Sequence, residues 1–313
     1  MRTAVLALGG NALARSDEPA TVTNQFRHAR ESIAPIVELA KQGWRIVIVH
    51  GNGPQVGDEM LRNEVARKVV EPLPLGVLVA ETAGWIGYML QQTLQNALAT
   101  AGVQREVVTV ITQTLVDRYD PALQQPTKPI GHPLSAQEAT RIRESGRAVG
   151  KDGSGQWRRL ATSPLPLGIV EFPVIKRLLD SGALVIAAGG GGPPVYQDPL
   201  LGLEGLDAVV DKDRVSAILA SQLEAEVLMI LTNVDAVFEG WGTAQARPIR
   251  RMSVEQAERM IAGGSLDAGG MKPKVEAAVG FVQSGGARAI IARLSDGPAA
   301  LRGQTGTTIV RTL

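Results

Sequence analysis

Short apolar runs alternate with longer stretches of helical periodicity along most of the chain. The apolar runs are rich in Ala, Val, Leu and Ile and predict strands at 4–8, 45–49, 106–112, 184–188, 227–231, 289–292 and 307–311. Between them, apolar residues recur at helical spacing and predict helices at 23–42, 55–67, 76–100, 172–180, 212–222 and 272–283, with another after Ser253. Strands that alternate with helices are typical of a parallel sheet covered by helices. The pattern therefore predicts an α/β fold.

Residues from about 118 to 166 interrupt this alternation. They are rich in proline, glycine and charged residues and lack long apolar runs, although 135–144 has the pattern of a short helix. A structureless loop of this length is uncommon inside a compact domain. We therefore expect an excursion that projects from the sheet.

Composition and charge exclude several kinds of chemistry. The 32 basic and 31 acidic side chains leave a net charge of +1, and no run of like charge indicates a nucleic-acid or membrane surface. The chain has no cysteine, which excludes disulfides, thiolate catalysis and thiolate metal sites. The apolar segment near the N-terminus is too short for a signal peptide or a membrane span. We expect a cytoplasmic protein whose partners are small molecules.

Four predicted strands end in turns rich in Gly, Asn or Asp. These turns are Gly9-Gly10-Asn11, Gly51-Asn52-Gly53-Pro54, the run from Gly189 to Pro194, and Thr232-Asn233-Val234-Asp235. The carboxyl ends of parallel strands share one sheet edge, where ligands bind in open α/β folds. Glycine lets the backbone approach a ligand, and exposed N–H groups favour anions. One such turn is a common way to leave a strand, but four at one edge indicate an anion site, with phosphate as the expected ligand.

The usual nucleotide motifs are missing. None of the turns fits the GxxxxGK[ST] loop, and no GxGxxG follows the first strand. The segment after 51 begins a similar pattern, but Gly57 comes one residue late. These observations disfavour the classical nucleotide folds.

Three lysines lie in constrained turns. Lys128 lies between prolines, Lys212 lies between two aspartates at a predicted helix start, and Lys274 follows a proline at another helix start. A cation at a helix N-terminus opposes the helix dipole, so its placement needs another reason. Phosphoryl transfer needs positive groups around the moving phosphoryl. The alternative for each lysine is a surface cation paired with a nearby carboxylate; Lys272, in the same turn as Lys274, is expected to be exposed.

Seven motifs together resemble those of the carbamate kinases, within the amino acid kinase family. They are LALGGNA (6–12), HGNGPQVG (50–57), PTKPIG (126–131), AGGGG (188–192), DKD (211–213), LTNVD (231–235) and MKPKVEAA (271–278). They occur in the family's order, so the resemblance covers essentially the whole chain. HGNGPQVG and PTKPIG are specific to this group, whereas LGGN and GGGG are shared with sister kinases.

The resemblance implies a three-layer αβα sandwich with a mainly parallel central sheet. The chain would form a single amino acid kinase domain, 1–313, with an acceptor-side N-lobe at about 1–185 and an ATP-side C-lobe at about 186–313. The excursion at 118–166 would be a small protruding subdomain that carries Lys128 over the site. The resemblance also implies a homodimer and a place in arginine metabolism.

The resemblance also implies roles for individual residues. Carbamate and the transferring phosphoryl would be held by Gly9, Gly10, Asn11, Gly51, Asn52 and Gly53. Lys128, Lys212 and Lys274 would stabilise the transition state, and Asp213 would orient lysines. The nucleotide would be bound by Gly189, Gly190, Lys212, Thr232, Asn233, Val234, Asp235, Met271 and Lys274.

The reaction implied is reversible transfer of the γ-phosphoryl of MgATP to carbamate. Carbamate is already an anion, so no general base is required, and alignment and charge neutralisation suffice. No residues have metal-ligand spacing, and Mg²⁺ would be carried mainly by the ATP phosphates. We expect His50 to position its turn, His28 to lie on a helix surface and His132 to lie in the excursion.

Three other functions compete with this interpretation. A sister amino acid kinase would act on another carboxylate or phosphate acceptor. Acetylglutamate kinase and related enzymes carry a lysine two residues before the glycines of the first strand, whereas this chain resembles them without that lysine and has Ala7 there. A dinucleotide-dependent oxidoreductase would need the missing fingerprint. A silent nucleotide sensor would not need the intact lysine set. Gly269-Gly270-Met271 also replaces the family's more usual Gly-Ser-Met.

Overall fold

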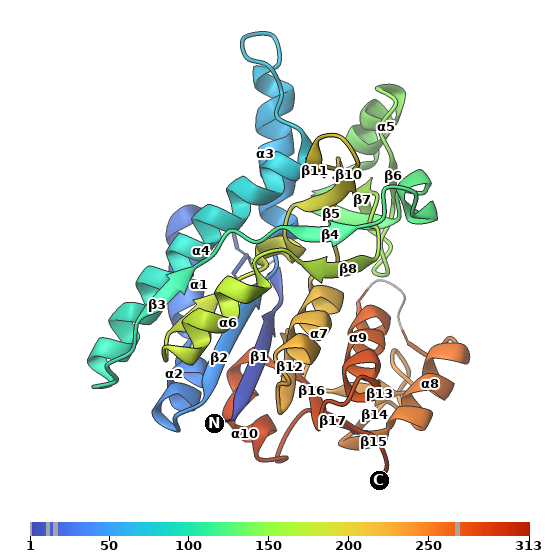
Figure 1. The fold of residues 1–313 in the computed structure, drawn as a ribbon. Coiled ribbons are helices and arrows are strands. Elements are labelled where there is room, and N and C mark those ends of the chain that lie inside the picture. The colour runs from blue at the N-terminus through green and yellow to red at the C-terminus, as the bar shows by residue number, and fades with distance from the viewer. Residues whose placement is uncertain (1, 11–12, 15–17, 267–269) are drawn as a thin grey trace.

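An eight-stranded sheet forms the centre of the computed structural model, which describes residues 2–10, 13–14, 18–266 and 270–313 (Figure 1). The strand order is β15-β17-β16-β12-β1-β2-β9-β3. Their bounds are Thr3–Leu8 (β1), Arg45–His50 (β2), Val107–Thr109 (β3), Leu184–Ile186 (β9), Val227–Thr232 (β12), Arg251–Ser253 (β15), Arg288–Arg293 (β16) and Thr307–Val310 (β17). Neighbouring strands pair in parallel except β16 and β17, which are antiparallel. The predicted mainly parallel sheet is confirmed.

Helices cover both faces of this sheet. One face packs against α1 (Val22–Ser32), α2 (Ala34–Lys41), α4 (Leu75–Thr100) and α10 (Gly297–Leu301). The other packs against α6 (Phe172–Asp180), α7 (Lys212–Gln222), α8 (Val254–Ala262) and α9 (Met271–Gln283). Successive residues of a strand point to opposite faces, so Val5 and Ala7 enter one core while Leu6 and Leu8 enter the other. The three-layer αβα sandwich is therefore present.

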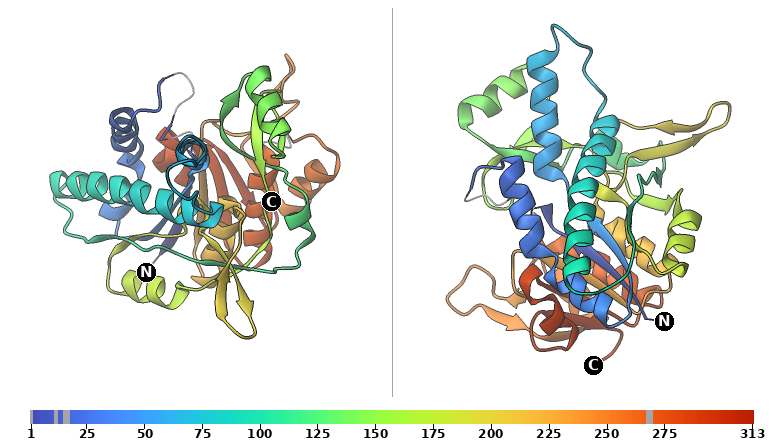
Figure 2. Two further views of the ribbon diagram at one scale, coloured as in Figure 1. Left: turned by 90° about the horizontal axis from the view of Figure 1, so that it is seen from above. Right: turned by 90° about the vertical axis from the view of Figure 1, so that its left-hand side faces the viewer.

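The region 118–166 is a small subdomain with its own sheet. β5 (Lys128–Leu134), β7 (Trp157–Ala161) and β6 (Val149–Lys151) pair in that order, with α5 (Ala136–Glu144) beside them and a short 3-10 helix, η2 (Pro121–Gln124), before them. Figure 1 shows this unit beyond the carboxyl ends of β1 and β2, and both views of Figure 2 show it outside the central sheet. We call it the protruding subdomain. The expected excursion and its short helix are confirmed.

Three departures from the predicted elements have local causes. The helix predicted at 23–42 is two helices, because Pro35 has no N–H to donate within a continuous helix. The strand predicted at 106–112 ends at Thr109, and the chain then joins a second sheet, β11-β10-β4-β8. That sheet was missed because its strands are short and lack an apolar run. They are β4 (Thr114–Val116), β8 (Pro166–Ile169), β10 (Pro194–Asp198) and β11 (Gly202–Gly205).

The remaining elements are α3, a small hairpin and two short turns of helix. α3 spans Gly53–Ala66, β13 (Val237–Glu239) pairs with β14 (Arg247–Ile249), and the 3-10 turns are η3 (Gly189–Gly191) and η4 (Leu294–Asp296). Among the described residues, no helix combines the length and apolar character needed to cross a bilayer.

Candidate active site

The turns after β1 and β2 lie against each other at the carboxyl edge of the sheet. The N–H of Gly51 donates to the carbonyl of Leu8 over 2.9 Å. A Cβ placed on Gly51 would lie 2.9 Å from the nitrogen of Gly10 and 3.3 Å from Cδ of Lys212. Only glycine permits this approach, so within the β2 turn (51–53) it is Gly51, which has no side chain, that leaves room for the stem of Lys212.

Asn52 is held in the β2 turn by the long helix behind it. Its Nδ2 donates to Oγ1 of Thr82 over 2.9 Å, and the Thr82 hydroxyl donates to the carbonyl of Leu78 over 2.7 Å. Both Asn52 and Thr82 are buried. Gly53 then begins α3, so the unpaired backbone N–H groups of that helix start at this turn. Asn11, the other predicted acceptor-side amide, lies outside the described residues.

The glycines of η3 pack onto the β2 turn. Gly190 has a φ of +69°, and a Cβ there would lie 2.2 Å from Nδ2 of Asn52. A Cβ on Gly189 would lie 2.5 Å from Nε2 of His50. Of these two predicted nucleotide-binding glycines, Gly190 therefore packs on the β2 turn and Gly189 on the end of β2, and their contact with a nucleotide stays a prediction.

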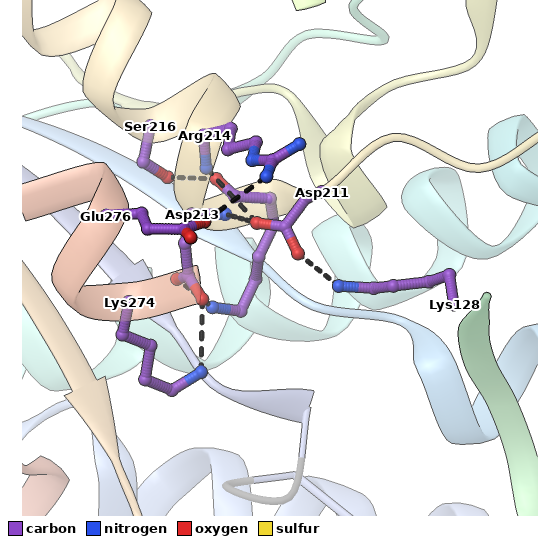
Figure 3. Close-up of polar contacts among 8 residues, drawn as sticks. Lys128, Asp211, Asp213, Arg214, Ser216, Lys274 and Glu276 are labelled. Carbon is purple, nitrogen blue, oxygen red and sulfur yellow. Dashed lines mark hydrogen bonds and ion pairs between the residues drawn. The ribbon is translucent and has the colours of Figure 1, made fainter. Parts of the chain in front are cut away.

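Two aspartates at the start of α7 bind the three lysines, and Figure 3 labels Lys128 and Lys274 beside them. Lys212 Nζ lies 2.5 Å from Oδ1 of Asp213, and Lys274 Nζ lies 3.0 Å from its Oδ2. Lys128 of β5 donates to Oδ2 of Asp211. These five residues, the lysine cluster, come from three segments that are far apart in the sequence, with 83 positions between Lys128 and Asp211 and 61 between Asp213 and Lys274.

Asp211 also caps the N-terminus of α7. Its Oδ1 accepts the N–H of Asp213 at 2.9 Å and that of Arg214 at 3.2 Å. An aspartate in this position satisfies orphan N–H groups and suits the positive end of the helix dipole. The contact with Lys128 was not predicted, because a capping pattern reports only the neighbouring residues and not a strand 83 positions away.

Burial and the neighbouring charges act in opposite directions on the pKa values of Lys212, Lys274 and the two aspartates, and their balance differs between residues. Burial alone would raise the pKa of Asp213, but Lys212 and Lys274 outweigh it and hold that pKa well below its ordinary value. Burial would also raise the pKa of Asp211, but the charge of Lys128 outweighs burial and lowers the pKa of that carboxyl. Burial lowers the pKa of Lys212 despite Asp213, whereas Asp213 overcomes burial and raises the pKa of Lys274. Both carboxylates are thus ionised at neutral pH.

The other predicted nucleotide-side residues lie at the ends of β12 and α9. Thr232 is the last residue of β12, and its Cα would lie 3.7 Å from a Cβ placed on Gly9. In the turn that follows, Asn233 is exposed, whereas Val234 and Asp235 are half-buried. Met271 opens α9 about one turn before Lys274. Met271 therefore lies on the same helix as Lys274 of the lysine cluster. Thr232 lies beside Gly9, in the turn that follows β1.

Two expectations about single side chains were wrong. His28 is buried rather than on a helix surface, since α1 turns this side inward and Nδ1 of His28 lies 3.0 Å from the carbonyl of Leu13. Lys272 is half-buried rather than exposed, in the first turn of α9. His132 lies in the protruding subdomain as predicted, 3.2 Å from Asp58. Residue 269 of the Gly-Gly-Met segment lies outside the described residues.

His50 is wholly buried below the glycines. Its Nδ1 lies 3.1 Å from the carbonyl of Gly51. Burial lowers its pKa to about 4, with a smaller contribution of the same sign from the charge of Lys212. A neutral imidazole packed beneath the turn agrees with the predicted positioning role, which remains a prediction.

Residues 2–293 match the sequence model of the amino acid kinase family. The chain belongs to this family. An amino acid kinase named carbamate kinase, from Pyrococcus horikoshii, is 42% identical over 308 residues that cover 97% of this chain and 98% of the relative. The recognition made from the seven motifs is confirmed.

Solved structures of amino acid kinases agree with this assignment. Carbamate kinase from Giardia lamblia bound to citric acid is 37% identical, with a TM-score of 0.93 over 99% of this chain and 98% of that chain. The same enzyme bound to AMP-PNP is 37% identical, with a TM-score of 0.89 over the same shares. The fold class predicted for this amino acid kinase is therefore confirmed over its whole length.

Proposed function

We propose that this chain is a carbamate kinase, which transfers a phosphoryl group reversibly between MgATP and carbamate to give ADP and carbamoyl phosphate. The relatives that carry this name align along nearly the full chain. The observation that carries the proposal is the lysine cluster, where three ammonium groups meet two carboxylates beside the glycines of the β2 turn. The acceptor would be bound by the turns after β1 and β2.

The lysine cluster supplies what phosphoryl transfer needs. Negative charge spreads over the oxygens of the transferring phosphoryl, and fixed positive groups stabilise it without reorganisation. Lys212 lies against Gly51, so we place its ammonium nearest the transferring group. Lys274 would act from the nucleotide side through α9, and Lys128 from the protruding subdomain. Asp213 would orient Lys212 and Lys274.

Mg²⁺ would be bound mainly by the ATP phosphates. Both oxygens of Asp213 accept lysines, and those of Asp211 accept Lys128 and the backbone of α7, so neither carboxylate has a free oxygen for a resident cation. Within the described ranges, no three His, Cys, Asp or Glu side chains lie close enough to hold a metal. This donor set suits a metal that enters with its nucleotide and neutralises phosphate charge there.

The nucleotide would lie on the C-lobe side, at about 186–313. Its proposed contacts are the ends of β12 and α9 together with η3. The Giardia enzyme was solved with AMP-PNP, an ATP analogue, which supports ATP as the nucleotide here. The N-lobe, at about 1–185, would hold the acceptor. We also propose that the protein is a cytoplasmic homodimer, and analytical ultracentrifugation would determine its oligomeric state.

A sister amino acid kinase with a larger acceptor is the alternative. Ala7 is fully buried on the α7 face of β1, so β1 brings no cation to the site from this position. Lys128 and Lys212 would provide the missing positive charge. This arrangement favours a small acceptor that is already anionic.

The purified protein should form ATP from ADP and carbamoyl phosphate in the presence of Mg²⁺. In the reverse direction, ADP release should depend on carbamate and not on acetylglutamate, aspartate or UMP. A faster reaction with any of those three acceptors would overturn the assignment in favour of a sister kinase. NAD should cause no thermal shift.

A further inference from the structure

α3 connects the β2 turn to the protruding subdomain. The helix begins at Gly53 of that turn, and its second turn packs directly on β5. A Cβ placed on Gly57 would lie 2.0 Å from Cα of Gly131, and Gly131 itself has a φ of +74°. The two backbones are therefore in van der Waals contact, which requires glycine at both positions.

An arginine–glutamate fork closes the same interface further along α3. Nη1 of Arg159, on β7, donates to Oε1 of Glu64 over 2.6 Å, and Nη2 donates to Oε2 over 2.8 Å. Arg147 also donates to Glu64. Arg159 is only 7% exposed, so this pair is shielded more than a surface ion pair. Two parallel charge-assisted bonds fix orientation as well as distance.

The strand register connects this fork to Lys128. In the antiparallel pair of β5 and β7, Lys128 lies opposite Ala161 and Ile130 lies opposite Arg159. Opposed residues and residues two apart share a face, so these four side chains project from one face of the subdomain sheet. Ile130 and Ala161 pack in a small buried cluster with Val56 of α3. Lys128 and Arg159 therefore lie on neighbouring strands of one face, offset by two residues, which is about 7 Å of backbone along the strand direction.

We propose that Glu64 and Arg159 are positioning residues for the reaction. With the Gly57–Gly131 contact, they hold the subdomain sheet on α3 so that Lys128 reaches the site at a fixed distance from the β2 turn. One helix thus sets both the acceptor turn and the lysine that acts above it. This inference rests on the proposed function, since it assigns the fork to the placement of Lys128 during transfer.

Glu64→Gln and Arg159→Lys test this role by kinetics. Glu64→Gln keeps the size of the side chain and Arg159→Lys keeps its charge, but neither variant can form the two parallel charge-assisted hydrogen bonds. We expect each to lower kcat for ATP formation about tenfold or more, because small misplacements are costly, and to leave the KM for ADP unchanged. Glu255→Gln, which alters an exposed pair with Arg259 on α8, is the matched control and should behave as wild type.

A double-mutant cycle separates positioning from general structural damage. In a Lys128→Ala background, Glu64→Gln should cause no further loss of kcat, because the lysine that it positions is gone. An equal fold-loss in both backgrounds, or wild-type kcat in both single variants, would overturn the inference.

Hydrogen exchange tests whether the fork anchors the subdomain, independently of enzyme activity. Residues 126–134 should exchange faster in Glu64→Gln than in wild type, while α7 is unchanged. Equal exchange in the two proteins would also overturn the inference. A wild-type protein that makes no ATP from carbamoyl phosphate would instead contradict the proposed function, and the exchange result would still decide whether the fork anchors the subdomain.

Discussion

Asp213 shows how single residues organise the site. Its buried carboxylate receives one ammonium group on each oxygen, so Lys212 and Lys274 are held close together despite their like charge. The simpler alternative, three surface cations each paired with a local carboxylate, does not fit this shared partner. We infer that the lysines are held ready for an anion.

Lys274→Ala should lower kcat by about 100-fold or more, the scale seen when one preorganised donor to a transition state is removed. Lys272→Ala, in the same helical turn, is the matched control and should keep wild-type kcat. Both variants should unfold at nearly the wild-type temperature, because Asp213 keeps Lys212 as a partner. Steady-state kinetics and thermal denaturation measure the two effects, and a wild-type rate in Lys274→Ala would remove this lysine from the mechanism.

His50 should make folding stability depend on pH. Its pKa is about 4 in the folded protein and about 6.5 when unfolded, so the unfolded chain binds one more proton between these values. Stability therefore falls as pH is lowered, by up to about 1.4 kcal/mol per pH unit and about 3 kcal/mol by pH 4. The lowered pKa values of Asp211 and Asp213 keep these groups ionised between pH 6.5 and 5.

Urea unfolding of wild type and His50→Gln at pH 6.5 and pH 5 tests this dependence. The free energy of unfolding should fall more steeply in wild type, since glutamine does not titrate. The same difference between the two pH values in both proteins would show that His50 does not cause it.

At the scale of elements, the sequence predicted the apolar strands and amphipathic helices and missed what lacks such a pattern. The sheet that contains β4, β8, β10 and β11 has short strands without apolar runs, and its pairing is set by distant partners. The break between α1 and α2 had a visible signal in Pro35, which a periodicity argument overlooks. Local patterns thus predict elements, and tertiary pairing adds the rest.

The η3 turn should tolerate no side chain at Gly190. Alanine there would be strained by the positive φ, by about 1–2 kcal/mol, and its Cβ would also overlap the amide of Asn52. Gly182, with a φ of +94° and open space around it, is the matched control. Both alanine variants should lose stability in thermal unfolding, but only Gly190→Ala should lose kinase activity. Full activity in Gly190→Ala would mean that Asn52 can move without consequence.

At the scale of the whole molecule, the candidate site joins segments that local reasoning cannot bring together. The seven motifs predicted that Asp213 would orient lysines, and the structure pairs Asp213 with Lys212 and Lys274, while the catalytic roles of these residues stay predictions. The motifs did not predict that Lys128 would reach Asp211, or that α3 would support the subdomain through Arg159 and Glu64. These contacts depend on the packing of the subdomain against α3, which no local pattern encodes.

Chelation should separate activity from folding in the whole protein. EDTA should abolish ATP formation, and excess Mg²⁺ should restore it, because the metal is expected to enter with the nucleotide. The unfolding temperature of nucleotide-free protein should not change, since the carboxylates of the lysine cluster are already occupied. A lower unfolding temperature in EDTA would reveal a resident structural cation instead.

Asp211 and Asp213 neutralise most of the positive charge of the three lysines. Three ammonium groups against two carboxylates leave one net positive charge, and every ammonium group has an internal counter-anion. Under the proposed function, an entering phosphoryl group would therefore compete with Asp211 and Asp213 for contacts with the lysines. When the product leaves, the two carboxylates would again pair with the lysines. Under the proposed function, this exchange of partners would allow tight transition-state contacts without trapping the product.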